Sequence, residues 1–511
     1  MTRAARALAI VVALAALAAT SPRTGGSLRL FLGAEPARPV PWEMLTPADR
    51  LLVAAVFGTL LVEEPDGSLH SGLARAWEHD VMVAAGPATA PEATPLESVP
   101  VAVPPAAPLR EHWTLHLDPL ARFADGSRVT PADVIASWEK LLRSHGSRHA
   151  FLLDPIDGAA AFRDGKAERI AGLTGEGSDL GVTLARATPD LPARLAHPAL
   201  GIGRPAREGA PLGSGAFDAA PGELDVRENP FHPGGRPYLD GFRIVAAGAV
   251  DPALLIDANA ADVAIVYGRS AGRLLEAPSA TVTVTRWPTA DRGYLLFLNP
   301  GSGFFANSPA IRRLLTRALD RDAMLRYLFD GRGETLTSLL PGGPALEPFV
   351  PGPPAGGSRS RVPLTFDRND PLAQSVAARI KAAWQEIGIV AELDGLDAST
   401  LSERIAKGQY AATIGLAQAG SRDPILSLWE TLAGLGPLAT QKAPSLAEGV
   451  LDPDPLARLA CAQRAEAALI EEGHLLPLVR LDAYLATRSR LVGVEPFQAG
   501  LFRLDDAWLR P

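Results

Sequence analysis

The stretch Phe123-Ala-Asp-Gly-Ser-Arg-Val-Thr-Pro-Ala-Asp-Val134 is the most informative segment of this 511-residue sequence. Asp125-Gly126 indicates a tight turn, because glycine accepts the positive φ that such turns need. Thr130 suits the N-cap of a helix and Pro131 its first position, and Asp133 can return a hydrogen bond to the cap. The segment therefore predicts a turn followed directly by a helix.

The same string, continued by Ser137-Trp138, resembles the pattern F-x-D-G-x-x-(V/L)-T-A-x-D-V-x-x-S-W of the family 5 extracellular solute-binding proteins. These proteins are the ligand receptors of peptide- and nickel-importing ABC transporters. Other segments resemble further motifs of the family, in the family's order: Glu64-Pro-Asp-Gly67, Leu73-Ala-Arg-Ala-Trp77, Gly213-Ser-Gly-Ala-Phe217, Asn229-Pro-Phe-His-Pro-Gly-Gly-Arg-Pro-Tyr-Leu-Asp240, Tyr294-Leu-Leu-Phe-Leu-Asn299 and Arg317-Ala-Leu-Asp-Arg321.

The resemblance implies an α/β fold with two lobes and a hinge, as in the type II, cluster C-like periplasmic binding proteins. Lobe I is expected to comprise residues 27–245 and 480–511, and lobe II residues 246–479. The chain would cross between the lobes near residues 245–251 and 474–481. Two crossing strands form a hinge that lets the lobes close over a ligand.

An extra subdomain, over about residues 56–184, is implied for lobe I. Inside it, Trp77-Glu-His and Trp113-Thr-Leu-His-Leu are two segments that would pair as a hairpin. Residues 84–108 separate them and are dominated by alanine, proline and valine. Each proline lacks an amide donor, so we expect this segment to be an extended or disordered insertion.

One part of the sequence alternates strand and helix twice. Residues 362–366 read as a strand, and Pro371 opens a helix whose apolar stripe includes Trp384. Residues 389–393 and 411–414 read as the next two strands, with a second helix between them. This β-α-β-α-β order predicts parallel strands in one open sheet, with Trp384 in the core.

The composition and the N-terminus indicate a compartment. The net charge of −8 argues against a nucleic-acid binder. Arg3 and Arg6 precede an apolar run over residues 7–19, so residues 1–20 are predicted to be a signal peptide. The only cysteine, Cys461, lies far from this segment and offers no lipid-anchor site; it is expected to be a small buried thiol. We expect a periplasmic protein and a monomer.

Signatures of catalysis and metal binding are weak. Ser137 and Lys140 match the S-x-x-K of penicillin-binding enzymes, but the companion motifs S-D-N and K-T-G are absent. His145 and His149 are spaced as metal ligands on a helix could be, although Gly146 and Ser147 between them favour a solvated pair. We therefore expect neither an enzyme nor a bound metal or cofactor.

The predicted ligand-binding residues are Asp423, Arg422, Trp42 and Trp429. In peptide-carrying relatives, an aspartate in a D-x-x-D-P segment binds the ligand's α-ammonium group, and Asp423 matches the aspartate before proline. The alternative is that Asp423 starts a turn or caps the helix that contains Trp429. Trp42 forms part of the cleft wall or packs in the core.

The resemblance implies the substrate-binding component of an ABC transporter, which captures short peptides and delivers them to a permease in the inner membrane. Other cargoes stay open: a nickel chelate, haem, an opine or an oligosaccharide. Two other classes also stay open, namely a solute sensor without transport and a hydrolase that uses Ser137.

Overall fold

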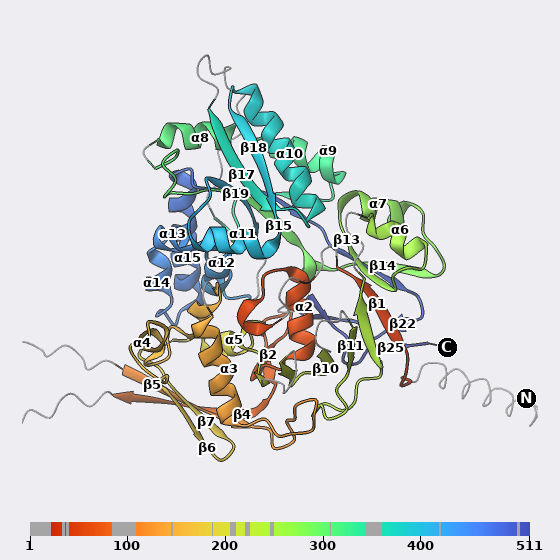
Figure 1. Ribbon diagram of the computed structural model, residues 1–511, viewed down its shortest axis with the longest axis vertical. Helices are drawn as coiled ribbons and strands as arrows, with labels where there is room; N and C mark the ends of the chain where they lie inside the picture. The colour runs from red at the N-terminus through yellow and green to blue at the C-terminus, as the bar shows by residue number, and fades with distance from the viewer. Residues whose placement is uncertain are drawn as a thin grey trace, which may run out of the picture.

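The computed structural model describes residues 22–32, 36, 40–83, 109–144, 147–186, 188–204, 211–219, 225–245, 250–306, 308–343, 360–417, 421–497 and 501–510. The expected signal peptide (residues 1–20) and the expected insertion (residues 84–108) lie outside these residues. Within them, two large sheets and one smaller sheet organise the chain. Each large sheet forms the centre of one lobe (Figure 1).

The sheet of lobe I has seven strands, and its central strand β1 (Ser27–Phe31) lies parallel to both of its neighbours. In order across the sheet, the strands are β10 (Phe217–Ala219), β11 (Asp225–Glu228), β12 (Gly241–Ile244), β1, β13 (Val263–Val266), β21 (Tyr484–Arg488) and β14 (Val282–Arg286). All four residues of β13 are buried, as expected for a strand covered on both faces.

The sheet of lobe II has six strands and contains the predicted β-α-β-α-β unit. In order, the strands are β16 (Gly333–Thr335), β20 (Leu475–Leu481), β15 (Arg292–Leu298), β19 (Ala412–Ala417), β17 (Arg361–Asp367) and β18 (Val390–Leu396). Strand β17 is parallel to β18 and β19, which confirms the predicted parallel arrangement. Helix α10 (Pro371–Glu386) packs on this sheet, and Trp384 is fully buried, as predicted.

The first crossing between the lobes differs from the expectation, whereas the second directly follows the expected range, residues 474–481. Strands β13 and β14 pair in the sheet of lobe I, so the chain first changes sheet at residues 287–291 and not near residues 245–251. It returns at residues 482–483, directly after β20. The difference arises because β13 pairs beside β1, which begins more than 200 residues earlier, and no local pattern encodes such a neighbour.

Arg286 holds the two crossings together. Its guanidinium donates to the Asp291 carboxylate at 2.6 Å, to Asp482 at 2.8 Å and to the carbonyl of Ala483 at 3.1 Å. The amide of Ala483 in turn donates to Asp291 at 2.8 Å. One side chain thus ties the outgoing segment to the returning one.

The smaller sheet belongs to the expected extra subdomain. Its antiparallel order is β4 (Ala74–Val83), β5 (Leu109–Leu117), β7 (Asp179–Thr183) and β6 (Leu173–Glu176). Trp77 lies opposite Leu115, which confirms the predicted hairpin. Helix α3 (Pro131–Arg143) follows the Asp125-Gly126 turn as predicted, and Asp133 accepts from the Thr130 amide at 2.9 Å. Arg204 then fixes Asp133 through two further hydrogen bonds.

The remaining helices and short strands connect or cover these sheets. The helices are η1 (Pro41–Glu43), α2 (Pro47–Val56), η2 (Ala150–Leu153), α4 (Ala159–Arg163), α5 (Leu191–Leu195), η3 (Pro198–Leu200), α6 (Pro252–Asp257), α7 (Gly268–Glu276), η4 (Pro288–Ala290), α8 (Pro309–Arg317), α9 (Arg321–Phe329), α11 (Ala398–Ala406), α12 (Pro424–Ala433), α13 (Pro437–Gln441), α14 (Ser445–Gly449) and α15 (Pro455–Glu471). The short strands are β2 (Leu61–Glu63), β3 (Leu69–Ser71), β8 (Gly203–Arg204), β9 (Leu212–Gly213), β22 (Leu491–Val492), β23 (Glu495–Phe497), β24 (Leu501–Arg503) and β25 (Trp508–Leu509).

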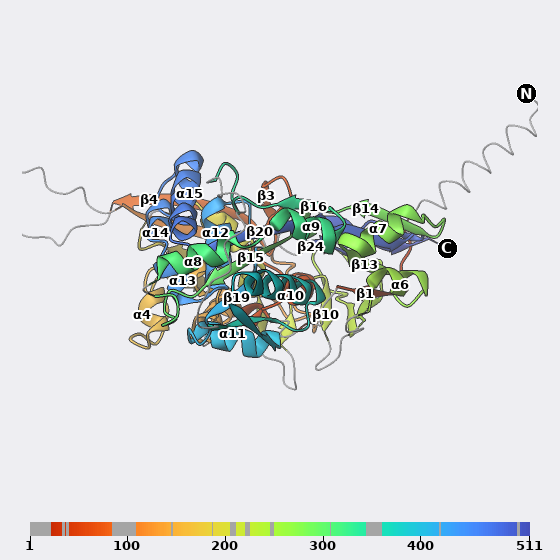
Figure 2. The same ribbon diagram turned by 90° about the horizontal axis from the view of Figure 1, so that it is seen from above.

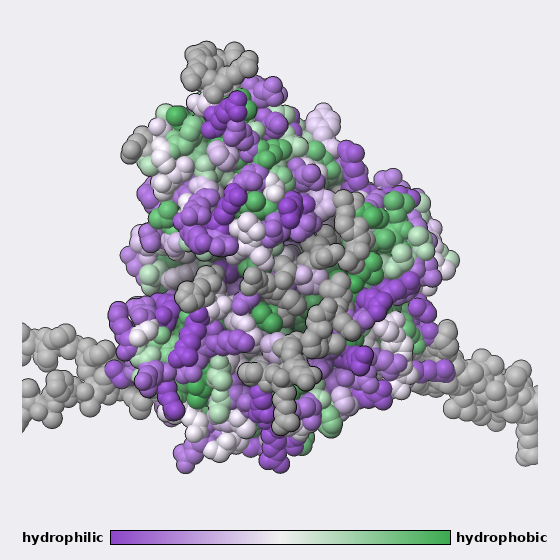
Figure 3. Space-filling view, viewed as in Figure 1, coloured by the Kyte–Doolittle hydropathy of each residue, from purple (hydrophilic) through white to green (hydrophobic). Residues whose placement is uncertain are grey.

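The molecule is broad in one view and flattened in the other (Figures 1 and 2). Lobe II forms its upper part in Figure 1, the sheet of lobe I lies at the right, and the extra subdomain lies below. In the coloured part of the face drawn in Figure 3, hydrophobic residues are interspersed with hydrophilic ones. Among the residues that the structure describes, no helix has both the length and the apolar character needed to cross a membrane.

Candidate functional site

A cavity of about 580 Å³ lies between the two lobes. Lobe I contributes residues 45–50, at the start of α2, and residues 147–163 around η2. Lobe II contributes the end of β17, helix α11, strand β19, helix α12 and the segment after α12. This volume is typical of sites for small molecules, and a wall from each lobe makes the site dependent on their relative position.

Aromatic rings from the two lobes meet in the lining of this cavity. Trp429 of α12 stacks on Phe151 of η2, with ring centroids 5.6 Å apart and an interplanar angle of 5°. Both residues line the cavity, together with apolar side chains such as Leu401 and Ile405. Part of the site is therefore an apolar surface that is complete only when the lobes are in contact.

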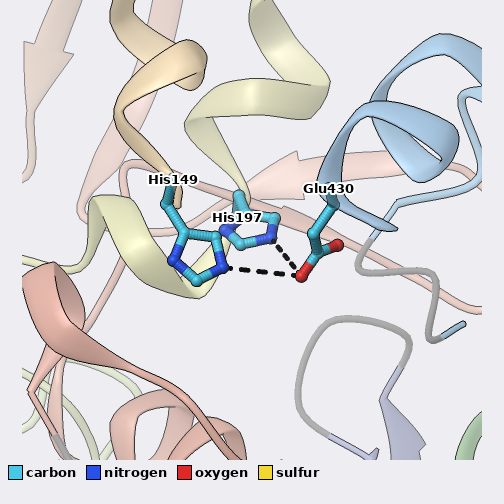
Figure 4. Close-up of side chains that lie close together, drawn as sticks. All are labelled: His149, His197 and Glu430. Carbon is cyan, nitrogen blue, oxygen red and sulfur yellow. Dashed lines mark ion pairs between the residues drawn. The ribbon is translucent and has the colours of Figure 1, made fainter. Parts of the chain in front are cut away.

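A buried cluster beside the cavity joins the lobes through Glu430 of α12, the residue after Trp429. Arg50 of α2 donates to its Oε1 atom in a buried ion pair. His149 and His197 of lobe I each place Nε2 3.6 Å from the same oxygen (Figure 4). Burial alone would raise the pKa of Glu430, but Arg50 and the two histidines hold that pKa well below its usual range. Glu430 is therefore a carboxylate of lobe II whose cationic partner lies in lobe I.

The three residues His149, His197 and Glu430 lie close enough to hold a metal ion, with their ligand atoms within 4.8 Å of one another. Two observations argue against that use. The Nδ1 atom of His197 accepts a hydrogen bond from the Ala199 amide at 3.1 Å, so a neutral His197 carries its proton on Nε2, the atom that would bind the metal. Arg50 also occupies the carboxylate oxygen that the metal would share. These residues therefore fit a buried ionic cluster around Glu430, closed by the Arg50 ion pair, better than a metal site.

A second buried cluster also joins the lobes. Arg458 of α15 donates to Asp423 through two hydrogen bonds of 2.8 Å and to Asp190 of lobe I at 2.6 Å. Arg194 of α5 makes two more hydrogen bonds with Asp190, at 2.7 and 3.0 Å. The pKa of Asp190, which burial alone would raise, is lowered by these two arginines. The Asp190–Arg458 pair is thus a second ionic contact between lobe I and lobe II.

Asp423 occupies the position of a helix cap. It is the N-cap residue of α12, and its Oδ1 atom accepts from the Leu426 amide at 3.0 Å while both oxygens bind Arg458. Arg422 is exposed, and its amide donates to Glu63 at 3.1 Å. Neither residue lines the cavity. Asp423 therefore caps α12, which is the alternative that the sequence left open. Its ionic partner is Arg458 and not the neighbouring Arg422.

The two predicted tryptophans have different surroundings. Trp42 is buried in the core and packs edge-on against Phe57, with ring centroids 6.4 Å apart. The Lys140 ammonium lies 3.8 Å from the centroid of the Trp42 ring. It packs and does not line the cavity. Trp429 does line it, so it is the one predicted ligand residue that the structure brings to the site.

The other described residues that the sequence analysis considered, Ser137, His149 and Cys461, are buried inside the protein. The Ser137 hydroxyl is buried and bonds to backbone groups of Asp133 and Gly203. His149 is buried, and not solvated as expected, because it follows α3 into the lobe interface; His145 lies outside the described residues. Cys461 is buried in α15, as predicted.

The sequence reasoning did not identify Arg50, His197, Asp190 or Arg458. Each of these residues lies on a different element, and their contacts across the lobes, namely those of Arg50 and His197 with Glu430 and that of Asp190 with Arg458, join residues that are far apart in the sequence. Arg148 and Asp367, which also line the cavity, were likewise missed. The one local signal was the adjacent Arg148-His149 pair in the loop that follows α3.

Comparisons with known proteins agree with this architecture. The sequence profile of the bacterial extracellular solute-binding proteins, family 5 (middle part), matches residues 110–436. The probable D,D-dipeptide-binding periplasmic protein DdpA of Escherichia coli (strain K12) is 24% identical over 342 residues, which cover 62% of this chain and 64% of that protein.

Solved structures resemble nearly the whole chain. The murein tripeptide binding protein MppA of Escherichia coli superposes with a TM-score of 0.77 at 17% identity, covering 96% of this chain and 99% of that one. The periplasmic binding protein DppA from Helicobacter pylori, in complex with the peptide STSA, gives 0.74 at 15% identity, with the same coverage. NikA from Staphylococcus aureus, in complex with Ni(L-His)2, gives 0.71 at 13% identity, covering 93% and 97%. At these identities, the likenesses show a shared two-lobed fold.

The profile match extends over more than half of the chain, and two further segments that resemble the family's motifs, residues 64–67 and 73–77, precede it. The chain belongs to the bacterial extracellular solute-binding proteins of family 5.

Proposed function

We propose that this protein is the periplasmic substrate-binding component of an ABC importer, which captures short peptides and presents them to a permease in the inner membrane. The observation that carries the proposal is the cavity of about 580 Å³ whose walls come from both lobes. A ligand in this cavity contacts both walls only when the lobes are closed. It therefore favours the closed state by its higher affinity for that state.

The choice of peptides is supported by the relatives and by the lining. DdpA is named for D,D-dipeptides and MppA for a murein tripeptide, and DppA of Helicobacter pylori was solved with a tetrapeptide. The cavity combines an aromatic and aliphatic surface with a small number of charged side chains. Such a mixture suits a ligand that has charged ends and variable side chains.

Native mass spectrometry tests the proposal most directly. The protein, purified from periplasm without denaturation, is expected to carry short peptides, and a pool of tripeptides is expected to raise its melting temperature by mass action. Recovery of a nickel chelate, haem, an opine or an oligosaccharide would replace peptides as the cargo. Full-length protein in the cytosol, with its first 20 residues retained, would contradict the periplasmic assignment. Stimulation of the cognate permease's ATPase by the loaded protein would separate an importer component from a solute sensor.

A further inference from the structure

Most charged side chains that line the cavity are partnered inside the protein. Arg163 pairs with Asp154, and Arg50 pairs with Glu430. Asp370 caps α10 by accepting from the Leu372 amide at 3.0 Å, and it also accepts from the Tyr294 hydroxyl at 2.8 Å. These groups are already neutralised or hydrogen-bonded, so a ligand gains little charge pairing from them.

Arg148 is one exception, and it lies on the lobe I side of the cavity. Its Nη2 atom donates to the carbonyl of Leu45 at 2.6 Å, its Nε atom is buried without a hydrogen-bond partner, and it makes no ion pair with any described carboxylate. Burial lowers the pKa of Arg148, with the nearby Arg50 adding to the effect while Glu430 and Asp49 oppose it. A partly desolvated guanidinium beside a cavity is stabilised by an anion, and a carboxylate can accept two hydrogen bonds from it.

Asp367 is the second exception, and it lies on the lobe II side, at the end of β17. Its Oδ1 atom accepts from the Asn369 amide at 2.9 Å, and it forms no ion pair with any described cationic side chain. Burial and the neighbouring carboxylates of Asp370 and Asp397 raise its pKa to about 6, against the opposing effects of the Asn369 amide and Arg292. A carboxylate in these surroundings gains from a cation that enters the cavity.

We propose that the cavity selects zwitterionic solutes, with the ligand's carboxylate bound by Arg148 and its ammonium group by Asp367. The inference rests on the proposed peptide-binding function and goes further, because it assigns the two ends of the ligand to opposite walls. A ligand with both charges bridges lobe I and lobe II. A ligand with one end blocked leaves one wall with an unpaired, partly desolvated charge, so it stabilises closure less.

The test uses one equimolar pool of tripeptides in three forms: free, N-acetylated and C-amidated. Binding is measured by ultrafiltration and mass spectrometry, with calorimetry on the most retained sequences. We expect either block to weaken binding to the wild-type protein about 10- to 150-fold, the factor that corresponds to losing a hydrogen bond to a charged group. Arg148→Gln should bind the free and amidated pools equally, and Asp367→Asn should bind the free and acetylated pools equally.

Two matched controls remove the same kinds of charge from exposed surface pairs. Arg110→Gln breaks the pair with Asp157, and Asp164→Asn breaks the pair with Lys166. Both controls should discriminate between the pools as the wild-type protein does. Arg148→Lys and Asp367→Glu keep the charges and should retain part of the discrimination, which guards against variants that fail to fold.

The outcomes separate the two proposals. Binding of the blocked pools by the wild-type protein as tightly as the free pool overturns the zwitterion inference and leaves peptide binding in place. Binding of none of the pools overturns both. Loss of discrimination in the surface controls as well would also overturn the assignment to Arg148 and Asp367.

Discussion

Replacing Glu430 by glutamine is expected to open the lobes. In the closed structure, Glu430 of lobe II is the carboxylate partner of Arg50 of lobe I, and both side chains are buried. Removing one partner of a buried ion pair costs about 3–5 kcal/mol, because the remaining charge stays desolvated. We expect the lower part of this range, since the amide keeps the shape of the side chain and one acceptor oxygen.

The cost falls on the closed state, because opening the lobes returns Arg50 to water. A cost of about 3 kcal/mol lowers the ratio of closed to open molecules by roughly a hundredfold, and the apparent affinity for a ligand that needs the closed state falls by up to the same factor. The folding of each lobe should change little, because the two residues lie in different lobes.

Small-angle scattering of the ligand-free protein and calorimetry with a tripeptide pool measure the two effects. We expect a larger radius of gyration and weaker binding for Glu430→Gln. Glu334→Gln is the control, because it breaks an exposed pair with Arg480 in the same lobe, which is worth about 0–1 kcal/mol. A scattering curve of Glu430→Gln that superposes on that of the wild-type protein, together with an affinity within twofold, would show that the Glu430–Arg50 pair does not hold the lobes closed.

Three further predictions concern other residues. Burial lowers the pKa of His149 to about 3, so His149 binds a proton more readily in the unfolded chain than in the folded one. As the pH falls from 6.5 to 5, this difference should reduce the free energy of unfolding by about 2 kcal/mol. In denaturant titrations at several pH values, His149→Phe should make the free energy of unfolding less dependent on pH. Asp423→Ala should lower stability by about 1 kcal/mol or more through the lost helix cap and Arg458 contact, yet leave the preference for free over N-acetylated tripeptides intact; loss of that preference would make Asp423 the ammonium anchor. Trp384→Ala should cost about 3–5 kcal/mol, measured by chemical unfolding, because the side chain is fully buried and donates to the carbonyl of Leu315; a change below 1 kcal/mol would contradict its core position.

Local patterns predicted the local elements well. The turn and capping residues of the opening segment predict the start of α3, because cap, proline and acidic residue act within one helical turn. The apolar stripe through Trp384 and the two flanking strands predict the parallel unit of lobe II, because periodicity reports which face is buried. The order of family motifs supplied the two-lobed fold.

Non-local choices could not be predicted in the same way. The placement of β13 and β14 depends on pairing with β1 and β21, strands that lie far away in the sequence, and this is a property of the assembled lobe. Arg50 and Glu430 are 380 residues apart, and neither stands in a pattern that indicates the other. Asp423 matched a motif, but its carboxylate is taken up by Arg458, which only the structure brings to it.

The tie between the two crossings limits how the lobes can move. If the segments at residues 287–291 and 482–483 were independent, each could rotate about its own bonds, and the lobes could bend, twist and slide. Arg286 binds both segments, so a rotation in one is transmitted to the other, and motions that would separate them must break its hydrogen bonds with Asp291 or Asp482. We expect the remaining low-cost motion to be a rotation about a single axis through both segments. A membrane partner would then meet this protein in two well-defined shapes, and the difference between those shapes is what it could read as the presence of cargo.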